Sequence, residues 1–268
     1  MKYVAPLTLA GALASVLAAP FAHAADNDDR FTLRLGAMDA DTPSEFYAST
    51  VFQGEDLQFS QDFDLGSEVV PRVDGVFRFS DRNRLIFDYF KYDKDREVTL
   101  GEDLSYDDVT IPAGGFARAE ANFELASLLY DFSIMQSDAV SVGLQIGAQW
   151  AKLEGGLRAE AGENVYDGRA SEDGFAPVVG ARVTFTPGEK WLVNLQAQYM
   201  DAGWGDFGDY DGDISRANAV VEYRFTRNFG LFAGYDWFKL DVSTAGSDSV
   251  LGLDQRFKGP VAGVTLAF

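Results

Sequence analysis

The sequence predicts an all-β fold, namely a closed transmembrane antiparallel up-and-down β-barrel. Three observations lead to this prediction. An export-type leader stands at the N-terminus, the chain after it alternates apolar and polar residues, and the connections between the alternating runs are short and long in turn. Alternation with a period of two is typical of strands that have one apolar face. Short turns on one side and longer loops on the other are typical of bacterial barrels.

The first 24 residues have the pattern of a signal peptide. Lys2 precedes a charge-free run from Tyr3 to Phe21, and the small-x-small sequence Ala22-His23-Ala24 follows. Such a segment directs export and is removed at the small residues. We therefore predict a signal peptide over 1–24, cleaved after Ala24, and a β-barrel domain over 25–268. The alternative, an uncleaved membrane anchor, fits less well because acidic residues follow the site directly.

Composition excludes several classes of function. The chain has 42 acidic and 22 basic residues and a formal net charge of −20, so we expect no nucleic-acid partner. It has no cysteine, which excludes disulfides, cysteine-ligated metals and a thiol nucleophile. The single histidine is His23, in the leader, so the predicted mature chain has none.

The alternating runs have the length of membrane-crossing strands. Between Val140 and Trp150 every second residue is apolar, and the residues between them are small or polar. Similar runs cover 179–185, 191–199, 217–225, 229–237 and 260–268. A tilted strand crosses a bilayer in about 9–11 residues. Aromatic residues such as Trp191 and Trp237 stand at the ends of the apolar faces, where interfacial girdles are expected. A soluble barrel would carry such rings inside.

The strand number depends on the N-terminal region. Short turns are predicted at 80–83, 136–138, 187–189 and 226–228, and long, mostly acidic loops at 95–114, 159–174, 201–213 and 241–254. If 45–52 and 57–65 form two separate strands around a turn at 53–56, the barrel has twelve strands, which we favour. If 31–37 pairs directly with 69–79, it has ten. Because an open sheet edge is costly in lipid, 31–37 should pair with 261–268.

The C-terminal residues carry a family resemblance. Gly263, Leu266 and Phe268 lie in Gly-Val-Thr-Leu-Ala-Phe, which resembles the outer-membrane assembly signal, with Ala262 in place of the usual polar residue. The chain resembles small outer-membrane β-barrel proteins of Gram-negative bacteria, broadly the OmpW/OmpA-like group. The segment 63–66, Phe-Asp-Leu-Gly, is similar to one in uncharacterised barrels. The resemblance implies residence in the cell outer membrane, contact with its lipid and lipopolysaccharide, and assembly by periplasmic chaperones and the barrel assembly machinery.

The polar faces of the strands predict the lumen. Mixed charges there can line a passive pore for small solutes or ions, which is our first functional hypothesis, or pair across the lumen and close it, as in a non-conducting structural or interaction barrel. Phe232 and Phe238 fall on the same face and would narrow a pore. The lumen-lining candidates are Gln145, Gln149, Arg182, Asn194, Gln196, Gln198, Glu222, Arg224 and Asp236.

The residues do not favour an enzyme. Known enzymatic outer-membrane barrels use a catalytic histidine, which the predicted mature chain lacks. The sequence also has no Asp-Thr/Ser-Gly triplet of the kind that forms an aspartic dyad. We therefore predict no catalytic, cofactor-binding or metal-binding residues. The acidic segment 206–213 lacks the full calcium-loop pattern. We read it as a solvated loop rather than a calcium site, with weak divalent-cation bridging to lipopolysaccharide phosphates as the remaining option.

Overall fold

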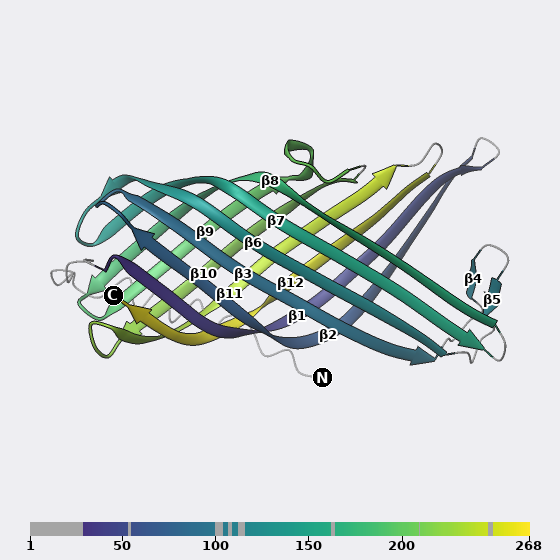
Figure 1. Cartoon of the computed structure of the whole chain (residues 1–268), viewed down its shortest axis with the longest axis horizontal. Helices are drawn as coiled ribbons and strands as arrows, with labels where there is room; N and C mark the ends of the chain where they lie inside the picture. The colour runs from purple at the N-terminus through teal and green to yellow at the C-terminus, as the bar shows by residue number, and fades with distance from the viewer. Residues whose placement is uncertain are drawn as a thin grey trace.

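The computed structural model describes residues 29–52, 55–99, 104–106, 109–111, 116–161, 164–208, 210–245 and 249–268. Ten long antiparallel strands close into a barrel in the order β1-β12-β11-β10-β9-β8-β7-β6-β3-β2 (Figure 1). A separate two-stranded sheet pairs β4 with β5. Among the described residues, no helix has the length and apolar character needed to cross a membrane.

The elements have the following bounds: β1 Phe31–Phe52, β2 Glu55–Arg78, β3 Asn83–Thr99, β4 Leu104–Tyr106, β5 Val109–Ile111, β6 Phe116–Gln136, β7 Val140–Ala161, β8 Asn164–Gly188, β9 Trp191–Asp201, the 3-10 helix η1 Ala202–Trp204, β10 Tyr210–Arg224, β11 Phe229–Ala245 and β12 Ser249–Ala267.

The favoured prediction of twelve strands is wrong, and the alternative of ten is confirmed. The segments 45–52 and 57–65 are not extra strands, because they are the outer ends of β1 and β2. The two segments pair with each other, with Glu45 opposite Asp62. The same ladder pairs Phe31 with Phe77 and Ala37 with Pro71. A strand with polar residues on both faces shows no alternation, so the sequence suggested a break where β1 simply continues. Residues 53 and 54 of the predicted turn lie outside the described residues.

The first and last strands close the barrel, as predicted. The ladder between β1 and β12 runs from Thr32 opposite Ala267 to Met38 opposite Val261 and resumes beyond it. Phe31 N donates to Phe268 O at 3.1 Å, and Phe268 N donates to Phe31 O at 2.9 Å. Closure leaves no strand edge in the lipid, where unpaired backbone groups cost several kcal/mol each.

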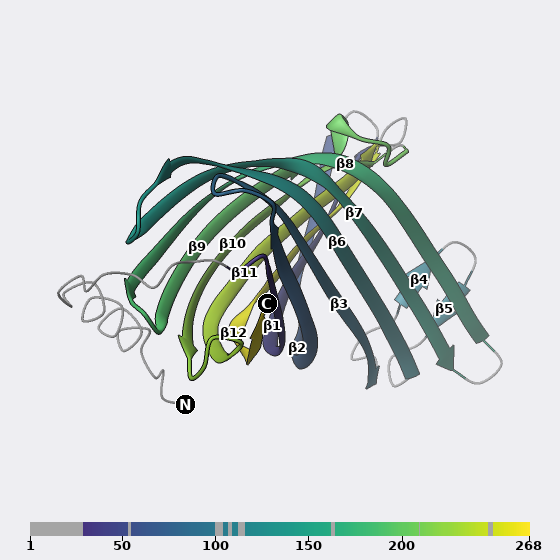
Figure 2. The same cartoon turned by 60° about the vertical axis from the view of Figure 1, so that its left-hand side comes forward.

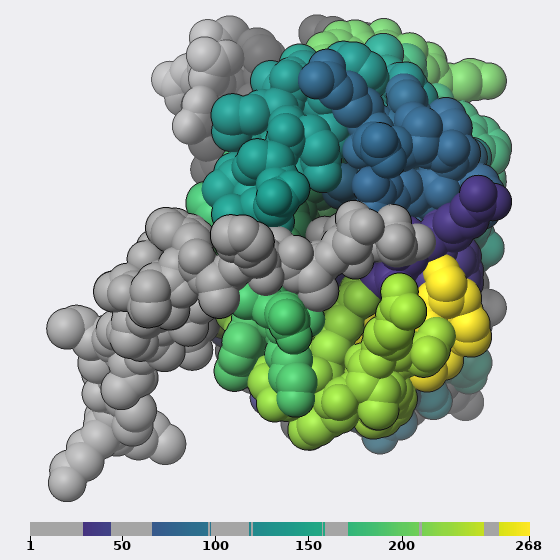
Figure 3. Space-filling view, turned by 90° about the vertical axis from the view of Figure 1, so that its left-hand side faces the viewer, coloured from purple at the N-terminus to yellow at the C-terminus, as the bar shows by residue number. Residues whose placement is uncertain are grey.

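Short turns and long strands lie at opposite ends. The turns between β2 and β3, β6 and β7, β8 and β9, and β10 and β11 gather at one end with the C-terminus, which we name the turn end (Figure 1). Figure 3 looks onto this end, where the coloured residues of several strand pairs form a ring. At the other end, the outer end, three of the four predicted long loops are mostly strand where the structure describes them, and the fourth, 201–213, contains η1 and the start of β10. This is a correction: β3 continues to Thr99, β7 to Ala161 and β11 to Ala245, with β8 beginning at Asn164.

The outer end therefore extends well past a bilayer. β1, β2, β6, β7 and β8 have between 21 and 25 residues each, about twice the roughly 9–11 that a crossing requires. Outward-facing side chains are apolar only nearest the turn end. On β7, for example, Leu144 and Ile146 are exposed, whereas Lys152 and Glu154 follow beyond Trp150. We call this zone of exposed apolar side chains the apolar belt.

Two seams divide the barrel wall beyond the belt. The ladder between β2 and β3 ends where Arg72 pairs with Phe90, and the ladder between β8 and β9 ends where Val178 pairs with Met200. Past these points, β2, β1, β12, β11 and β10 form one sheet, and β3, β6, β7 and β8 form another. Figures 1 and 2 show the two groups diverging towards the outer end.

Proline ends both ladders. Pro71 directly precedes Arg72 on β2, and Pro177 directly precedes Val178 on β8. Successive residues of an antiparallel strand direct their N–H groups to opposite neighbours. Phe79 N donates to Asn83 O, on the β3 side, so odd-numbered residues of β2, Pro71 included, face β3. Because proline has no N–H to donate, each of these ladders lacks a hydrogen bond at the residue next to its last pair.

Candidate functional site

The interior near the turn end holds a network of paired charges. Its ten members are Arg34, Arg72, Arg182, Arg216, Arg224, Asp74, Asp88, Asp131, Glu222 and Asp236. They come from β1, β2, β3, β6, β8, β10 and β11, and they alternate with outward apolar residues on their strands. We call them the arginine–carboxylate network. Buried ions are tolerated only when they are paired and hydrogen-bonded.

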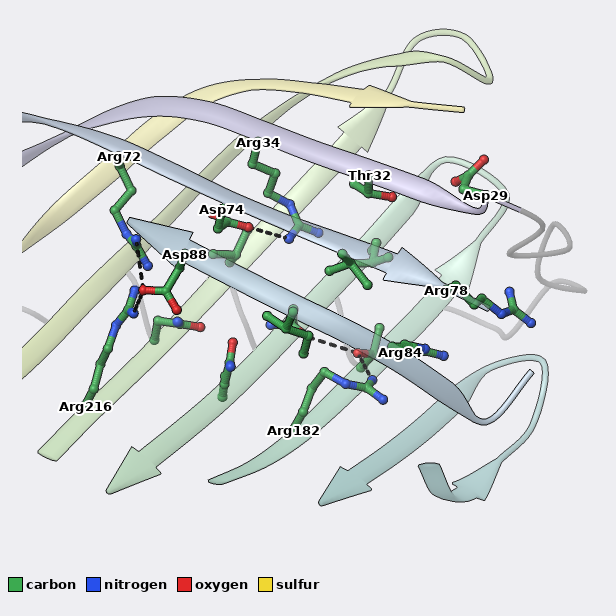
Figure 4. Close-up of a pocket in the computed structure, with 18 of the residues that line it drawn as sticks. Asp29, Thr32, Arg34, Arg72, Asp74, Arg78, Arg84, Asp88, Arg182 and Arg216 are labelled. Atoms are coloured by element: carbon green, nitrogen blue, oxygen red, sulfur yellow. Dashed lines mark hydrogen bonds and ion pairs between the residues drawn. The ribbon is translucent and has the colours of Figure 1, made fainter. Parts of the chain in front are cut away.

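One ion pair spans the full diameter. Arg216 Nη1 on β10 donates to Asp88 Oδ1 on β3 at 2.5 Å. β10 and β3 are five strands apart in either direction around the barrel. Arg72 and Arg216 also share Asp236, at 3.0 Å each, so two arginines and two carboxylates meet at the centre. Figure 4 shows three of the four, Arg72, Asp88 and Arg216.

Two further groups complete the network. Arg34 Nε donates to Glu222 Oε2 at 2.9 Å, and Arg34 Nη1 donates to Asp74 Oδ2 at 3.1 Å. Glu222 also accepts from Arg224, which pairs with Asp29. These contacts join β1 and β2 to β10 through the interior, because β11 and β12 separate β10 from β1 along the wall.

Arg182 forms the third group. Its Nε and Nη2 donate to the two carboxylate oxygens of Asp131 at 3.0 and 2.9 Å, the paired geometry in which arginine binds carboxylate most strongly. Its Nη1 donates to Thr184 Oγ1 at 2.6 Å, and that hydroxyl donates to Asn194 Oδ1 at 2.9 Å. Gln145 Nε2 adds a third donor to Asp131 at 3.1 Å.

A cavity of about 90 Å³ remains inside this part of the barrel. Arginines dominate its lining, with carboxylates from Asp29, Asp74 and Asp88. Figure 4 shows Arg72, Asp88 and Arg216 gathered at one end of it and Asp29, Arg78 and Arg84 at the other. Arg78 and Arg84 lie next to the turn that joins β2 to β3.

Aromatic rings fill the interior on the outer side of the network. Their five members are Phe90, Tyr92, Phe123, Phe238 and Phe257, all buried, from β3, β6, β11 and β12. We call them the aromatic cluster. Ring centroids of Phe238 and Phe257 lie 4.6 Å apart, and those of Phe123 and Phe238 lie 5.8 Å apart. Since β6 and β11 are also five strands apart, this cluster too reaches across the diameter.

Charged residues border the belt on its outer side. Lys91 Nζ donates to Glu124 Oε1 at 3.0 Å, and this hydrogen bond holds the pKa of the Glu124 carboxyl below its usual range. Lys239 pairs with Asp254 at 2.9 Å, and the hydrogen bond between them raises the pKa of the Lys239 ammonium. Together these residues mark the outer limit of the apolar belt.

The structure places the lumen candidates as follows. Gln145, Gln149, Arg182, Asn194, Gln198, Glu222 and Asp236 are buried, while Gln196 and Arg224 are half-buried. Four of them, Arg182, Arg224, Glu222 and Asp236, lie in the arginine–carboxylate network. Phe238 belongs to the aromatic cluster, and Phe232 is buried with its ring against Gly36.

The candidate assembly residues lie on or directly after β12. Gly263 stands opposite Gly36, and a Cβ at Gly263 would meet Leu35 O at 2.2 Å, so only glycine allows this close approach. Leu266 pairs with Leu33, and Phe268 is exposed at the turn end.

Sequence reasoning missed most of the arginine–carboxylate network and most of the aromatic cluster. Arg34, Arg72, Arg216, Asp74, Asp88 and Asp131 were not identified as lumen residues, nor were four of the five aromatic rings. A signal was present, because Asp88, Phe90 and Tyr92 share the period-two face opposite Leu85 and Phe87. No metal site emerges either: within the part of the chain that the structure describes, no group of three His, Cys, Asp or Glu side chains could hold a metal ion.

Comparisons with known proteins bear on the fold. No family model matches the chain, and no curated protein matches its sequence. The structure of the outer membrane protease OmpT from Escherichia coli is similar, with a TM-score of 0.56 and 10% identity over 90% of this chain and 97% of that one. The translocator domain of the autotransporter NalP from Neisseria meningitidis has a TM-score of 0.46 and 10% identity, covering 88% of this chain and 89% of that one.

The outer membrane protein OprG from Pseudomonas aeruginosa has a TM-score of 0.39 and 12% identity, covering 93% of this chain and 99% of that one. At such identities the likeness concerns the fold alone. The closed ten-stranded barrel and its apolar belt have the architecture of an outer-membrane β-barrel, the fold that the OmpT structure also has. The closer resemblance to the OmpW/OmpA-like group stays a prediction.

Proposed function

We propose that this protein is a non-conducting outer-membrane barrel that acts through its outer end. The observation that carries the proposal is the ion pair between Arg216 and Asp88, which joins opposite walls of the barrel at 2.5 Å. An ion or solute following the lumen would have to separate these charges. Breaking a buried pair costs about 3–5 kcal/mol, because it leaves an uncompensated ion.

The aromatic cluster supports the same function from the next layer. Phe123 and Phe238 approach each other from opposite walls, and Phe257 stacks on both. Packed rings offer a hydrated ion no polar ligand in place of its water. A passive pore, our first hypothesis from the sequence, would therefore need two independent layers to open.

The outer end is the surface that such a barrel offers to its surroundings. Between Asp39 and Val69 the sequence has eight acidic residues and no basic one. Lys94 and Lys258 pair with two of these acids, Glu68 and Asp41, and the excess of acidic residues that remains attracts oppositely charged partners. We propose that it interacts with cationic partners, or with lipopolysaccharide phosphates through divalent cations. We propose no enzymatic activity, since the chain beyond Ala24 offers no histidine as a base.

Planar-bilayer recording tests the proposal. The purified protein, shown to be folded by a gel-mobility difference between boiled and unboiled samples, should insert without conductance steps. A double variant, Arg216→Ala with Phe238→Ala, removes one side chain from each layer and should produce small openings. Phe229→Ala, on the outward face of the same strand as Phe238, is the matched control and should stay silent.

Regular conductance steps from the wild-type protein would overturn the proposal and make the passive pore the better function. If the double variant is folded yet as silent as the wild type, the two layers are not what closes the lumen, and that part of the argument fails.

A further inference from the structure

We propose that the cavity near the turn end binds a small free oxyanion, with inorganic phosphate as its model, held by Arg84 and Arg78. This inference does not depend on whether the barrel conducts. It rests on a positive charge that the described interior does not balance.

Arg84 is the unbalanced charge. Only 9% of the residue is exposed, and it lines the cavity. Its Nη2 donates to Gln136 Oε1 at the long distance of 3.4 Å, and its Nε has no hydrogen-bond partner among the described residues. Within those same residues, no carboxylate lies within 4.0 Å of its guanidinium. A buried guanidinium without an anion is costly, so this site calls for one.

The nearest carboxylate is already engaged. Asp131 stands directly opposite Arg84 in the ladder between β3 and β6. Arg182 takes both of its oxygens, at 2.9 and 3.0 Å, and Gln145 adds a hydrogen bond at 3.1 Å. The fold thus brings an acid beside Arg84 and directs that acid towards another arginine.

A second arginine stands on the other side. In the ladder between β2 and β3, Arg78 is directly opposite Arg84. Like charges in directly opposed positions destabilise a sheet. Arg78 Nη1 is buried without a partner among the described residues, and the acid that pairs with Arg78, Asp81, has a side chain that is 91% exposed. An anion between the two guanidinium groups would turn this repulsion into two charge-assisted contacts.

The space suits a small anion. A water molecule needs about 10–15 Å³ of such space, so a cavity of about 90 Å³ holds several waters, or an oxyanion with part of its hydration. A lipid headgroup that brings its glycerol and acyl chains does not fit among the buried side chains. The planar fork of arginine matches the oxygens of phosphate and similar anions. The ligand is therefore a free oxyanion reaching the barrel from the turn end.

Calorimetric titration of the folded protein in detergent tests the inference. Sodium phosphate at pH 7 should give saturable heat, and sodium chloride at matched ionic strength should not. Arg84→Gln should weaken phosphate binding about tenfold or more, the size expected for losing a hydrogen bond to a charged group. Arg227→Gln removes an exposed charge from a turn at the same end and should leave binding unchanged.

Three outcomes would overturn the inference. The first is the absence of saturable phosphate heat in the wild type, and the second is an equal loss in Arg84→Gln and Arg227→Gln. The third is tighter binding of glycerol phosphate than of phosphate, which would indicate a headgroup source. If Arg84→Gln fails the boiled and unboiled gel test, Arg78→Gln takes its place, and unchanged binding in that variant would also overturn the inference.

Discussion

At the scale of single residues, the interior depends on shared partners rather than on isolated pairs. Asp88 accepts from Arg216 at 2.5 Å and lies 3.6 Å from Arg72, while Asp236 serves the same two arginines. Removing one carboxylate therefore affects both guanidinium groups. Arginine suits this arrangement because it has five donors in a rigid plane.

Asp88→Asn should destabilise the barrel by about 3–5 kcal/mol, because two buried arginines then share the single charge of Asp236. Guanidinium unfolding in detergent, followed by tryptophan fluorescence, measures the free energy. Asp93→Asn is the control: Asp93 lies on the same strand with an exposed side chain, and its loss should change stability by less than about 1 kcal/mol. Equal effects of the two changes would contradict a special role for Asp88.

Sequence could identify charged lumen residues but not their partners. Glu222 and Asp236 were recognisable as inward because they alternate with outward apolar residues such as Val221 and Tyr235. Strand number and stagger determine which side chains face each other across the lumen. The pairing of Arg34 with Glu222, and of Arg72 with Asp236, depends on both. A wrong strand count therefore prevents any prediction of pairs.

At the scale of elements, strand length was the weak point of prediction. Alternation is strong only in the apolar belt, where one face meets lipid. Beyond it, residues such as Asp39, Asp41, Lys152 and Glu154 place polar groups on the outward face, and the pattern resembles a loop. The strands nevertheless continue, because each backbone pairs with its neighbours in the ladder.

Pro71 is predicted to set the length of the ladder between β2 and β3. Pro71→Val restores an N–H that faces β3 and should add one hydrogen bond, stabilising the barrel by about 0.5–1.5 kcal/mol. Hydrogen exchange should show a protected amide at position 71. Val73→Ile is the control, because it changes an outward-facing side chain on the same strand and adds no hydrogen-bond donor. An unprotected amide in Pro71→Val would show that the seam has another cause.

At the scale of the whole molecule, closure joins the first strand to the last. The backbone at Phe268 both accepts from Arg30 and Phe31 and donates back to Phe31, and the rings of Phe31 and Phe268 lie 6.4 Å apart. Phe268 thus completes the pairing between β1 and β12 at the turn end.

Deletion of Phe268 should reduce the amount of folded barrel in the outer membrane several-fold, because both the closing hydrogen bonds and the terminal aromatic group are lost. The fraction of the protein whose gel mobility changes on boiling measures this in isolated membranes. Phe229→Ala removes another exposed ring at the same end and should leave that fraction close to the wild-type value. A comparable loss in both variants would point to the apolar belt instead.

The two seams have a consequence for solubility. A barrel has no free strand edges within the lipid, yet β2, β3, β8 and the first residues of β10 each gain one where the wall divides. Free edges invite pairing with other chains, and proteins protect them with proline, lysine or a covering segment. All three devices are present. Pro71 and Pro177 stand where the edges begin, and Lys94 Nζ on β3 donates to Ser67 O on β2 at 2.9 Å. The segment after η1 covers part of β8, where Asp206 N donates to Phe175 O at 2.9 Å. The strand edges that the two seams expose are thus protected against pairing with other chains, and so against aggregation.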